Sequence, residues 1–119
     1  MLSFNKFNGS LKHAWRGLGE ELKSGHSFRI QAMTLVLLVA LLFLLRVRSA
    51  DAAILILVAA GVLVLELVNS VFERFLDIIS PGIGPHARDI KDIMAGAVLI
   101  AAAASLIVGA LIIIPYLIS

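Results

Sequence analysis

The stretch ELVNSVFERFLDIISPGIGPHARDIKD, residues 66–92, is the part of this chain around which the rest is arranged. It follows a strongly apolar run, residues 52–65, which is typical of a membrane span. Four polar side chains in its first half recur at offsets of 0, 3, 7 and 11: Glu66, Asn69, Glu73 and Asp77. These offsets place all four on one face of an α-helix. A carboxylate at bilayer depth is costly and usually marks a functional site, so this face is the first candidate for chemistry.

Composition places the whole chain in a membrane. Its 119 residues suffice for one domain, residues 1–119. Hydrophobic residues make up 61% of the chain, against about 45–50% in soluble domains. The net charge of +2 is too small to indicate a nucleic-acid partner. The chain has no cysteine, which excludes disulfides, cysteine nucleophiles and thiolate metal sites. We therefore expect an all-α integral membrane protein.

The apolar runs predict one surface helix and three membrane spans. Residues 10–24 form an amphipathic pattern in which Trp15 is flanked by basic residues, as in helices that lie in the membrane interface. Residues 1–9 before it are expected to be loosely ordered. The three predicted spans are residues 29–47, 52–79 and 90–117. Two prolines and two glycines in residues 80–85 end the second span.

The basic residues predict the orientation. Eight of them flank the spans on one side: Lys6, Lys12, Arg16, Lys23, Arg29, Arg74, Arg88 and Lys91. Only Arg46 and Arg48 lie on the other side. The positive-inside rule therefore places the N-terminus and the 74–91 loop in the cytoplasm. Three helices alone would leave the acids facing lipid, so we expect a homo-oligomer with its site between subunits.

Each candidate residue has a chemical and a structural interpretation. Glu66 suits a general base on a hydroxyl, or it is a carboxyl bonded to a neighbouring helix that holds the bundle together. Glu73, assisted by Asn69, suits Mg²⁺, or it is a solvated charge near a helix end. Lys91 suits a phosphate group, or its chain reaches the lipid headgroups. Asp92 also suits a helix N-terminus by its charge alone. The chain contains no phosphate-binding glycine loop and no H-E-x-x-H zinc motif.

Two segments of the chain resemble a known family. Residues 66–77 are similar to the E-x-x-N-[ST]-x-x-E-x-x-x-D signature of the small bacterial integral-membrane diacylglycerol kinases. Residues 81–99 resemble that family's P-x-x-x-P-x-A-[KR]-x-x-K-D-x-x-A-[GA]-A-V-L segment, in unbroken register. The sequence WRGL at residues 15–18 and FR at 28–29 also fall at the family's spacing. The family includes relatives that phosphorylate undecaprenol.

The resemblance implies a homotrimer of three-span protomers in the bacterial cytoplasmic (inner) membrane, with active sites that use MgATP. By motif position, Glu66 corresponds to the catalytic base and Glu73 to a metal-binding acid. Five further residues correspond to the nucleotide and phosphate site: Arg16, Asn69, Asp77, Lys91 and Asp92.

One position departs from the family pattern. The family usually has a second metal-binding glutamate four residues before the arginine of the F-R pair, and this chain has Gly25 there. Glu21 lies one helical turn earlier, and we hypothesise that it reaches the metal instead.

The sequence thus predicts a lipid kinase that transfers the ATP γ-phosphate to diacylglycerol, giving phosphatidic acid. The alternative substrate is undecaprenol. A small proton-coupled transporter with Glu66 as proton carrier, and an inactive relative in which Gly25 marks a lost site, are the alternatives from other classes. The run from Arg88 to Asp92 disfavours the transporter, which has no need for it.

Overall fold

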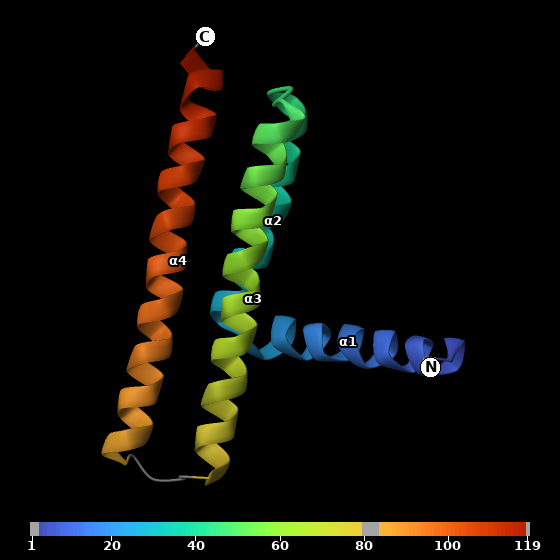
Figure 1. The fold of residues 1–119 in the computed structure, drawn as a ribbon, viewed down its shortest axis with the longest axis vertical. Helices are drawn as coiled ribbons and strands as arrows, with labels where there is room; N and C mark the ends of the chain where they lie inside the picture. The colour runs from blue at the N-terminus through green and yellow to red at the C-terminus, as the bar shows by residue number, and fades with distance from the viewer. Residues whose placement is uncertain (1–2, 80–83, 119) are drawn as a thin grey trace.

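The computed structural model describes residues 3–79 and 84–118, which form four helices. They are α1 (Phe4–Ser24), α2 (His26–Leu44), α3 (Ser49–Ile79) and α4 (Pro85–Ile118). Helices α2, α3 and α4 run alongside one another, with α3 packed against both others, while α1 projects sideways (Figure 1). The predicted all-α architecture with three helices that are long and apolar enough to cross a membrane is confirmed.

The helix α1 begins earlier than predicted. It starts at Phe4 rather than at residue 10, so the expectation that residues 4–9 are loosely ordered is wrong. The cause is a local cap: the Ser3 hydroxyl oxygen accepts a hydrogen bond from the Lys6 amide at 3.2 Å. Large apolar side chains, among them Phe4 and Trp15, are exposed along α1. Its placement on a membrane surface stays a prediction, to which these exposed side chains are suited.

The break between α1 and α2 falls at Gly25. The Gly25 amide donates to the Glu21 carbonyl at 2.7 Å, and the Arg29 amide donates to the Gly25 carbonyl at 3.0 Å. Helix α1 therefore ends and helix α2 begins at Gly25, whose extended backbone turns the chain from α1 into α2. We call residues 21–28 the α1–α2 junction.

The other helix ends differ from the predicted span limits by a few residues. Helix α2 ends at Leu44 rather than at residue 47, because Arg46 adopts a left-handed backbone with φ of 53° that a helix cannot contain. Helix α4 begins at Pro85 rather than at residue 90, since proline fits the first position of a helix. The predicted helix-ending residues 80–83 lie outside the described residues.

Helix lengths indicate how the chain would sit in a bilayer. At 1.5 Å per residue, the 19 residues of α2 span about 28 Å, close to the ~30 Å hydrocarbon core. The 31 residues of α3 span about 46 Å, so one end of α3 extends beyond that core. The end that carries Glu73 and Asp77 is the polar one, and it lies beside the start of α4.

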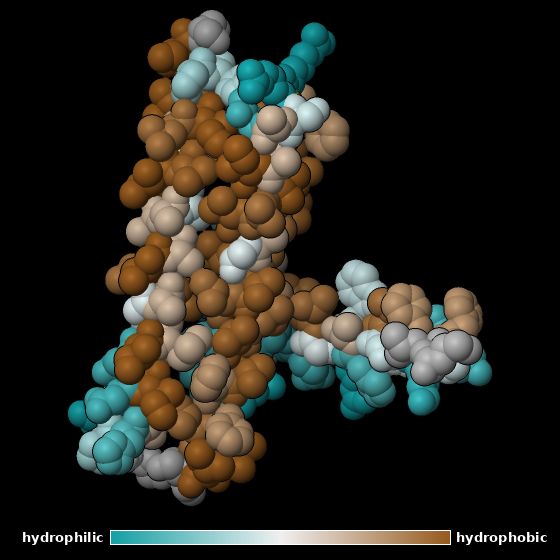
Figure 2. Space-filling model, in the orientation of Figure 1, coloured by the Kyte–Doolittle hydropathy of each residue, from teal (hydrophilic) through white to brown (hydrophobic). Residues whose placement is uncertain are grey.

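Few side chains are buried within a single chain. Helix α4 has no buried residue in its described range. Figure 2 shows a predominantly hydrophobic surface over the upper part of the long helices, with hydrophilic side chains gathered towards the ends of the bundle and beneath α1. In water such a surface would cause aggregation, whereas lipid or neighbouring apolar helices satisfy it. This is the surface of a membrane protein.

At the end of the bundle far from Asp77, one hydroxyl group ties two helices together. The Tyr116 hydroxyl of α4 donates to Asp51 Oδ2 at 2.6 Å and accepts a hydrogen bond from the Arg48 amide at 3.1 Å. The start of α3 and the end of α4 are therefore held in register.

Candidate active site

The polar face of α3 forms one wall of a pocket of about 320 Å³, and the α1–α2 junction forms the other. The junction contributes six residues: Glu21, Ser24, Gly25, His26, Ser27 and Phe28. Helix α3 contributes another six: Glu66, Asn69, Ser70, Glu73, Arg74 and Asp77. All four residues that the helical spacing places on one face line this polar pocket, and so does Glu21.

The Glu66 side chain is buried inside a single chain. Only 8% of the residue is exposed, and Phe28 across the pocket is exposed by 6%. The expectation that the acids of an isolated chain would face lipid is therefore wrong for Glu66. The reason is tertiary: the bend at Gly25 brings the α1–α2 junction over this part of α3. A neighbouring subunit is not needed to shield this carboxyl group.

Asn69 lies between the acids and has an unused acceptor. Its Nδ2 donates to Glu73 Oε1 at 3.3 Å. Its Oδ1 is buried and has no hydrogen-bond partner among the described residues. A buried amide oxygen without a partner costs free energy, which a bound cation or hydroxyl group would recover.

Lys91 joins the second half of the motif to the first. Its Nζ lies 2.9 Å from Asp77 Oδ1, so the start of α4 is ion-paired to the polar end of α3. Both side chains are partly exposed, and the pair can rearrange around a charged ligand. Lys91 itself does not line the polar pocket, and neither do the other two predicted nucleotide residues, Arg16 and Asp92, which are exposed.

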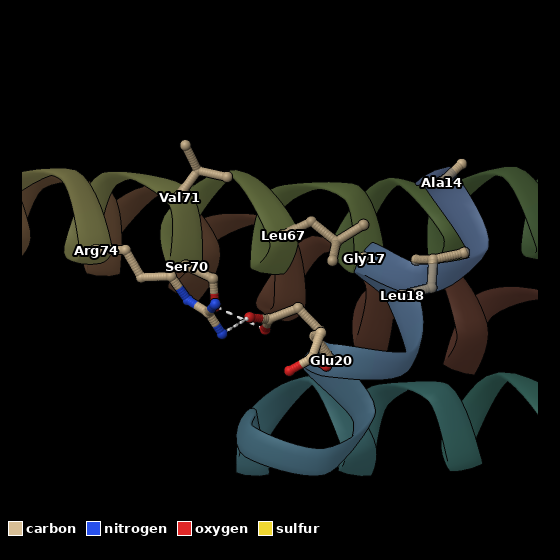
Figure 3. A pocket seen from close by; sticks show the side chains of 9 residues that line it. Ala14, Gly17, Leu18, Glu20, Leu67, Ser70, Val71 and Arg74 are labelled. Atoms are coloured by element: carbon tan, nitrogen blue, oxygen red, sulfur yellow. Dashed lines mark hydrogen bonds and ion pairs between the residues drawn. The ribbon is translucent and has the colours of Figure 1, made fainter. Parts of the chain in front are cut away.

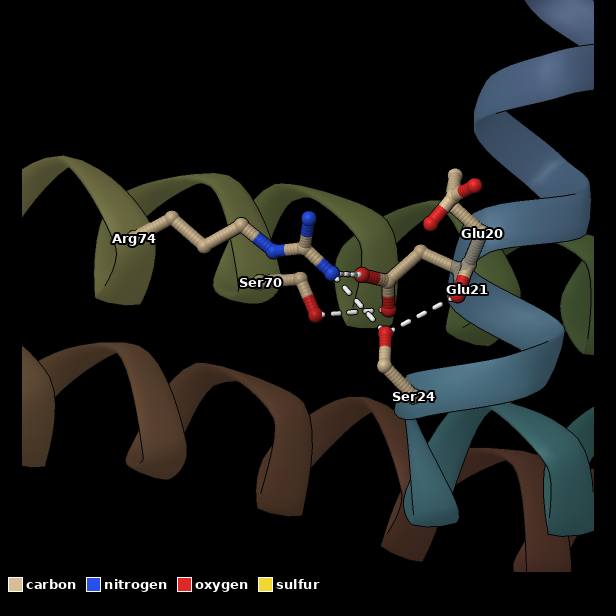
Figure 4. A network of polar contacts seen from close by, with 5 residues as sticks. All are labelled: Glu20, Glu21, Ser24, Ser70 and Arg74. Carbon is tan, nitrogen blue, oxygen red and sulfur yellow. Dashed lines mark hydrogen bonds and ion pairs between the residues drawn. The ribbon is translucent and has the colours of Figure 1, made fainter.

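The sequence interpretation missed three residues of the hydrogen-bond network around Glu21. Ser70 Oγ donates to Glu21 Oε2 at 2.7 Å, and an Arg74 guanidinium nitrogen donates to Glu21 Oε1 at 2.7 Å. The same nitrogen of Arg74 donates to Ser24 Oγ at 3.0 Å (Figure 4). Ser70 and Arg74 follow Glu66 by four and eight residues, so the helical spacing that picked out the acids could also have identified them.

The oxygen atoms of the polar pocket suit a hard cation. Among the described residues no three His, Cys, Asp or Glu side chains are grouped closely enough to hold a metal ion by themselves. Mg²⁺, however, is usually bound through one or two carboxylates together with waters and substrate phosphates. Glu73 and the partnerless Asn69 Oδ1 form such a donor pair. The residues present therefore fit Mg²⁺ that arrives with a phosphate ligand.

An apolar cleft adjoins the polar pocket. It encloses about 540 Å³ between α1 and α3. Its apolar lining is Ala14, Gly17, Leu18, Leu67 and Val71 (Figure 3). Glu21, Ser70 and Arg74 line both the cleft and the polar pocket, so these three side chains form their common wall. A molecule with an apolar chain and a polar head would find both environments side by side.

Comparison with known proteins identifies the family. A sequence model for the prokaryotic diacylglycerol kinases matches residues 12–113. A diacylglycerol kinase of Synechocystis sp. is 36% identical over 112 residues, which cover 92% of this chain and 63% of that protein. The chain thus spans less than two thirds of that relative. An undecaprenol kinase of Bacillus subtilis is 34% identical over 113 residues, covering 95% of this chain and 92% of that protein. With a family match that covers most of its length and relatives of both kinds, this chain belongs to the prokaryotic diacylglycerol kinase family.

Proposed function

We propose that this protein is a lipid kinase that transfers the γ-phosphoryl group of ATP to the hydroxyl group of a membrane-embedded alcohol. The observation that carries the proposal is the burial of Glu66 in a polar pocket that shares a wall with an apolar cleft. A kinase for lipids needs a base near bilayer depth and, next to it, a polar site for a triphosphate. Family membership supports the same reaction class.

In the proposed reaction Glu66 accepts the proton of the lipid hydroxyl group. The hydroxyl oxygen forms a bond to the γ-phosphorus of ATP, the bond from that phosphorus to the β,γ-bridging oxygen breaks, and ADP leaves. Glu73 and Asn69 would hold Mg²⁺, which supplies neutralisation of the phosphate charge when it is bound. Lys91, now paired with Asp77, lies at the polar end of α3, where it can approach the phosphates.

Three further residues have roles that were predicted from the sequence. Arg16 and Asp92 are assigned to the nucleotide, and both are exposed and free to approach a ligand from outside the polar pocket. For Glu21 the sequence predicts a metal-binding role, but both of its oxygens already accept hydrogen bonds within the chain, which favours a positioning role instead. Replacing Glu21 by alanine tests this assignment, since an unchanged Mg²⁺ requirement would contradict it.

Diacylglycerol is our first choice of alcohol and undecaprenol our second. The first choice follows the general label of the family, and the second is favoured by the Bacillus subtilis relative, which the chain covers almost fully. In an assay with radiolabelled ATP, the purified protein receives both lipids in competition and the products are identified by mass. Labelled phosphatidic acid supports the first choice, labelled undecaprenyl phosphate the second, and ATP use without a labelled lipid refutes the kinase.

We also propose a homotrimer whose N-terminus and 74–91 loop face the cytoplasm of a bacterial inner membrane. The exposed apolar surface of α4 supports contact between subunits, because none of its described residues is buried within one chain. Placing the loop in the cytoplasm puts the polar end of α3 where ATP is available. Mass measurement of the protein in detergent, together with labelling of single cysteines introduced into the cysteine-free chain, tests both statements.

A further inference from the structure

Glu21 is the most constrained charged side chain at the candidate site. Only 7% of the residue is exposed. One carboxylate oxygen accepts from Ser70 and the other from Arg74, each at 2.7 Å. Figure 4 shows the Arg74 side chain reaching from α3 to this carboxylate and to Ser24 on the last turn of α1. Each carboxylate oxygen thus has a hydrogen-bond donor within the chain.

These contacts bridge parts of the chain that are far apart in sequence. Glu21 and Ser24 belong to α1, whereas Ser70 and Arg74 belong to α3, about 50 positions later. Among the described residues they provide the hydrogen bonds between α1 and α3. Charge-assisted bonds of this length, largely shielded from water on the carboxylate side, are stronger than neutral ones. This network therefore links the last turns of α1 to the part of α3 that follows Glu66.

Gly25 leaves the space that the Glu21 carboxylate occupies. A Cβ atom at position 25 would lie 2.7 Å from Glu21 Oε2, 2.9 Å from the Glu21 carbonyl oxygen and 3.3 Å from the Phe28 Cβ. The first two distances are shorter than real contacts, and the carbonyl oxygen is fixed by its bond to the Gly25 amide. A side chain at position 25 would therefore crowd the Glu21 carbonyl oxygen and push the oxygen that accepts from Ser70 out of its place.

We propose that Glu21 is a positioning residue: its bonds to Ser70 and Arg74 hold the α1–α2 junction against α3, and this keeps the wall of the polar pocket in place beside Glu66. Gly25 is required because it leaves room for this carboxylate. The effect on turnover rests on the proposed function, whereas the effect on the position of α1 does not. A displacement of about 1 Å at a reacting group can lower turnover by on the order of a hundredfold, so the network would matter without touching substrate.

The structural arm of the test uses spin labels in the full chain, reconstituted in lipid nanodiscs without ATP or lipid substrate. The chain lacks cysteine, so labels go to cysteines introduced at the exposed positions Leu11 on α1 and Phe75 on α3. We expect a narrow distribution of distances between the labels in the parent. Glu21→Ala and Gly25→Ala should both broaden it. Glu20→Gln, which changes an exposed acid next to Glu21, is the matched control and should leave it narrow.

The kinetic arm separates positioning from metal binding. Glu21→Ala should lower kcat by about tenfold or more with little change in the KM for MgATP, and Glu21→Gln, which keeps an acceptor oxygen, should recover part of the loss. The double variant Glu21→Ala/Arg74→Ala should lose little more activity than either single variant, because both substitutions remove the same contact. Mn²⁺, whose binding is followed by its paramagnetic resonance spectrum, serves as the probe for Mg²⁺. If Glu21→Ala leaves the distance distribution unchanged but weakens the affinity for Mn²⁺, Glu21 is a metal ligand and the proposal is overturned.

The two arms also distinguish this proposal from the kinase proposal. Broadened distances in a protein that phosphorylates no lipid would refute the kinase and support the positioning of α1. A narrow distribution and normal turnover in both Glu21→Ala and Gly25→Ala would refute the positioning role alone.

Discussion

Replacing Glu66 by glutamine tests the proposed reaction at its centre. Glutamine has nearly the same shape as glutamate, and only 8% of Glu66 is exposed, so the packing of the polar pocket should be preserved. The amide cannot accept the proton of the lipid hydroxyl group. A positioned general base contributes typically 10²–10⁴-fold, which at about 1.36 kcal/mol per factor of ten corresponds to about 3–5 kcal/mol of the activation barrier. We expect kcat to fall by that factor.

The assay follows transfer of label from ATP to lipid, with nucleotide binding measured separately by calorimetry. We expect Glu66→Gln to bind MgATP nearly as tightly as the parent protein, because the predicted phosphate contacts come from other residues. Asp51→Asn is the matched control, since Asp51 is also a partly buried carboxylate on α3 but lies at its far end, bonded to Tyr116. It should keep normal turnover.

Two results would contradict this reasoning. Turnover within a few-fold of the parent would show that Glu66 is not the base, and its burial would then reflect helix packing. Strongly weakened nucleotide binding, with a normal rate once ATP is raised to saturation, would reverse the roles that we assign to Glu66 and to the polar end of α3.

Three further predictions address the other residues. Lys91→Met removes the cation next to Asp77 and should raise the KM for ATP by about tenfold, which initial rates over a range of ATP measure. Glu73→Gln should raise the Mg²⁺ concentration needed for half-maximal rate, because the cation then loses its carboxylate ligand and keeps only Asn69 Oδ1. A Mg²⁺ titration of the rate measures this change. Tyr116→Phe removes a hydroxyl group with two hydrogen bonds and should lower the free energy of unfolding by about 1–3 kcal/mol, with turnover unchanged. Thermal unfolding in detergent measures this loss.

The presence of three membrane-length apolar helices could be predicted because its signals are local. Apolar runs of membrane-spanning length and a proline-glycine segment are read within a few turns of the chain. The shared face of Glu66, Asn69, Glu73 and Asp77 follows from 3.6 residues per turn, and all four line one pocket in the structure. The early start of α1 was missed even though its signal, the Ser3 cap, is equally local.

Contacts across the fold could not be read in the same way. No periodicity connects Glu21 to Ser70 and Arg74, because these residues meet only where the bend at Gly25 brings the end of α1 against α3. The burial of Glu66 inside one chain depends on the same turn, and the sequence alone suggested the opposite. Residue types and spacing thus determined by themselves which side chains share a helix face and which helices can cross a membrane. The tertiary structure decided what faces them, because the partners of a buried charge are set by packing between distant segments and not by position along the chain.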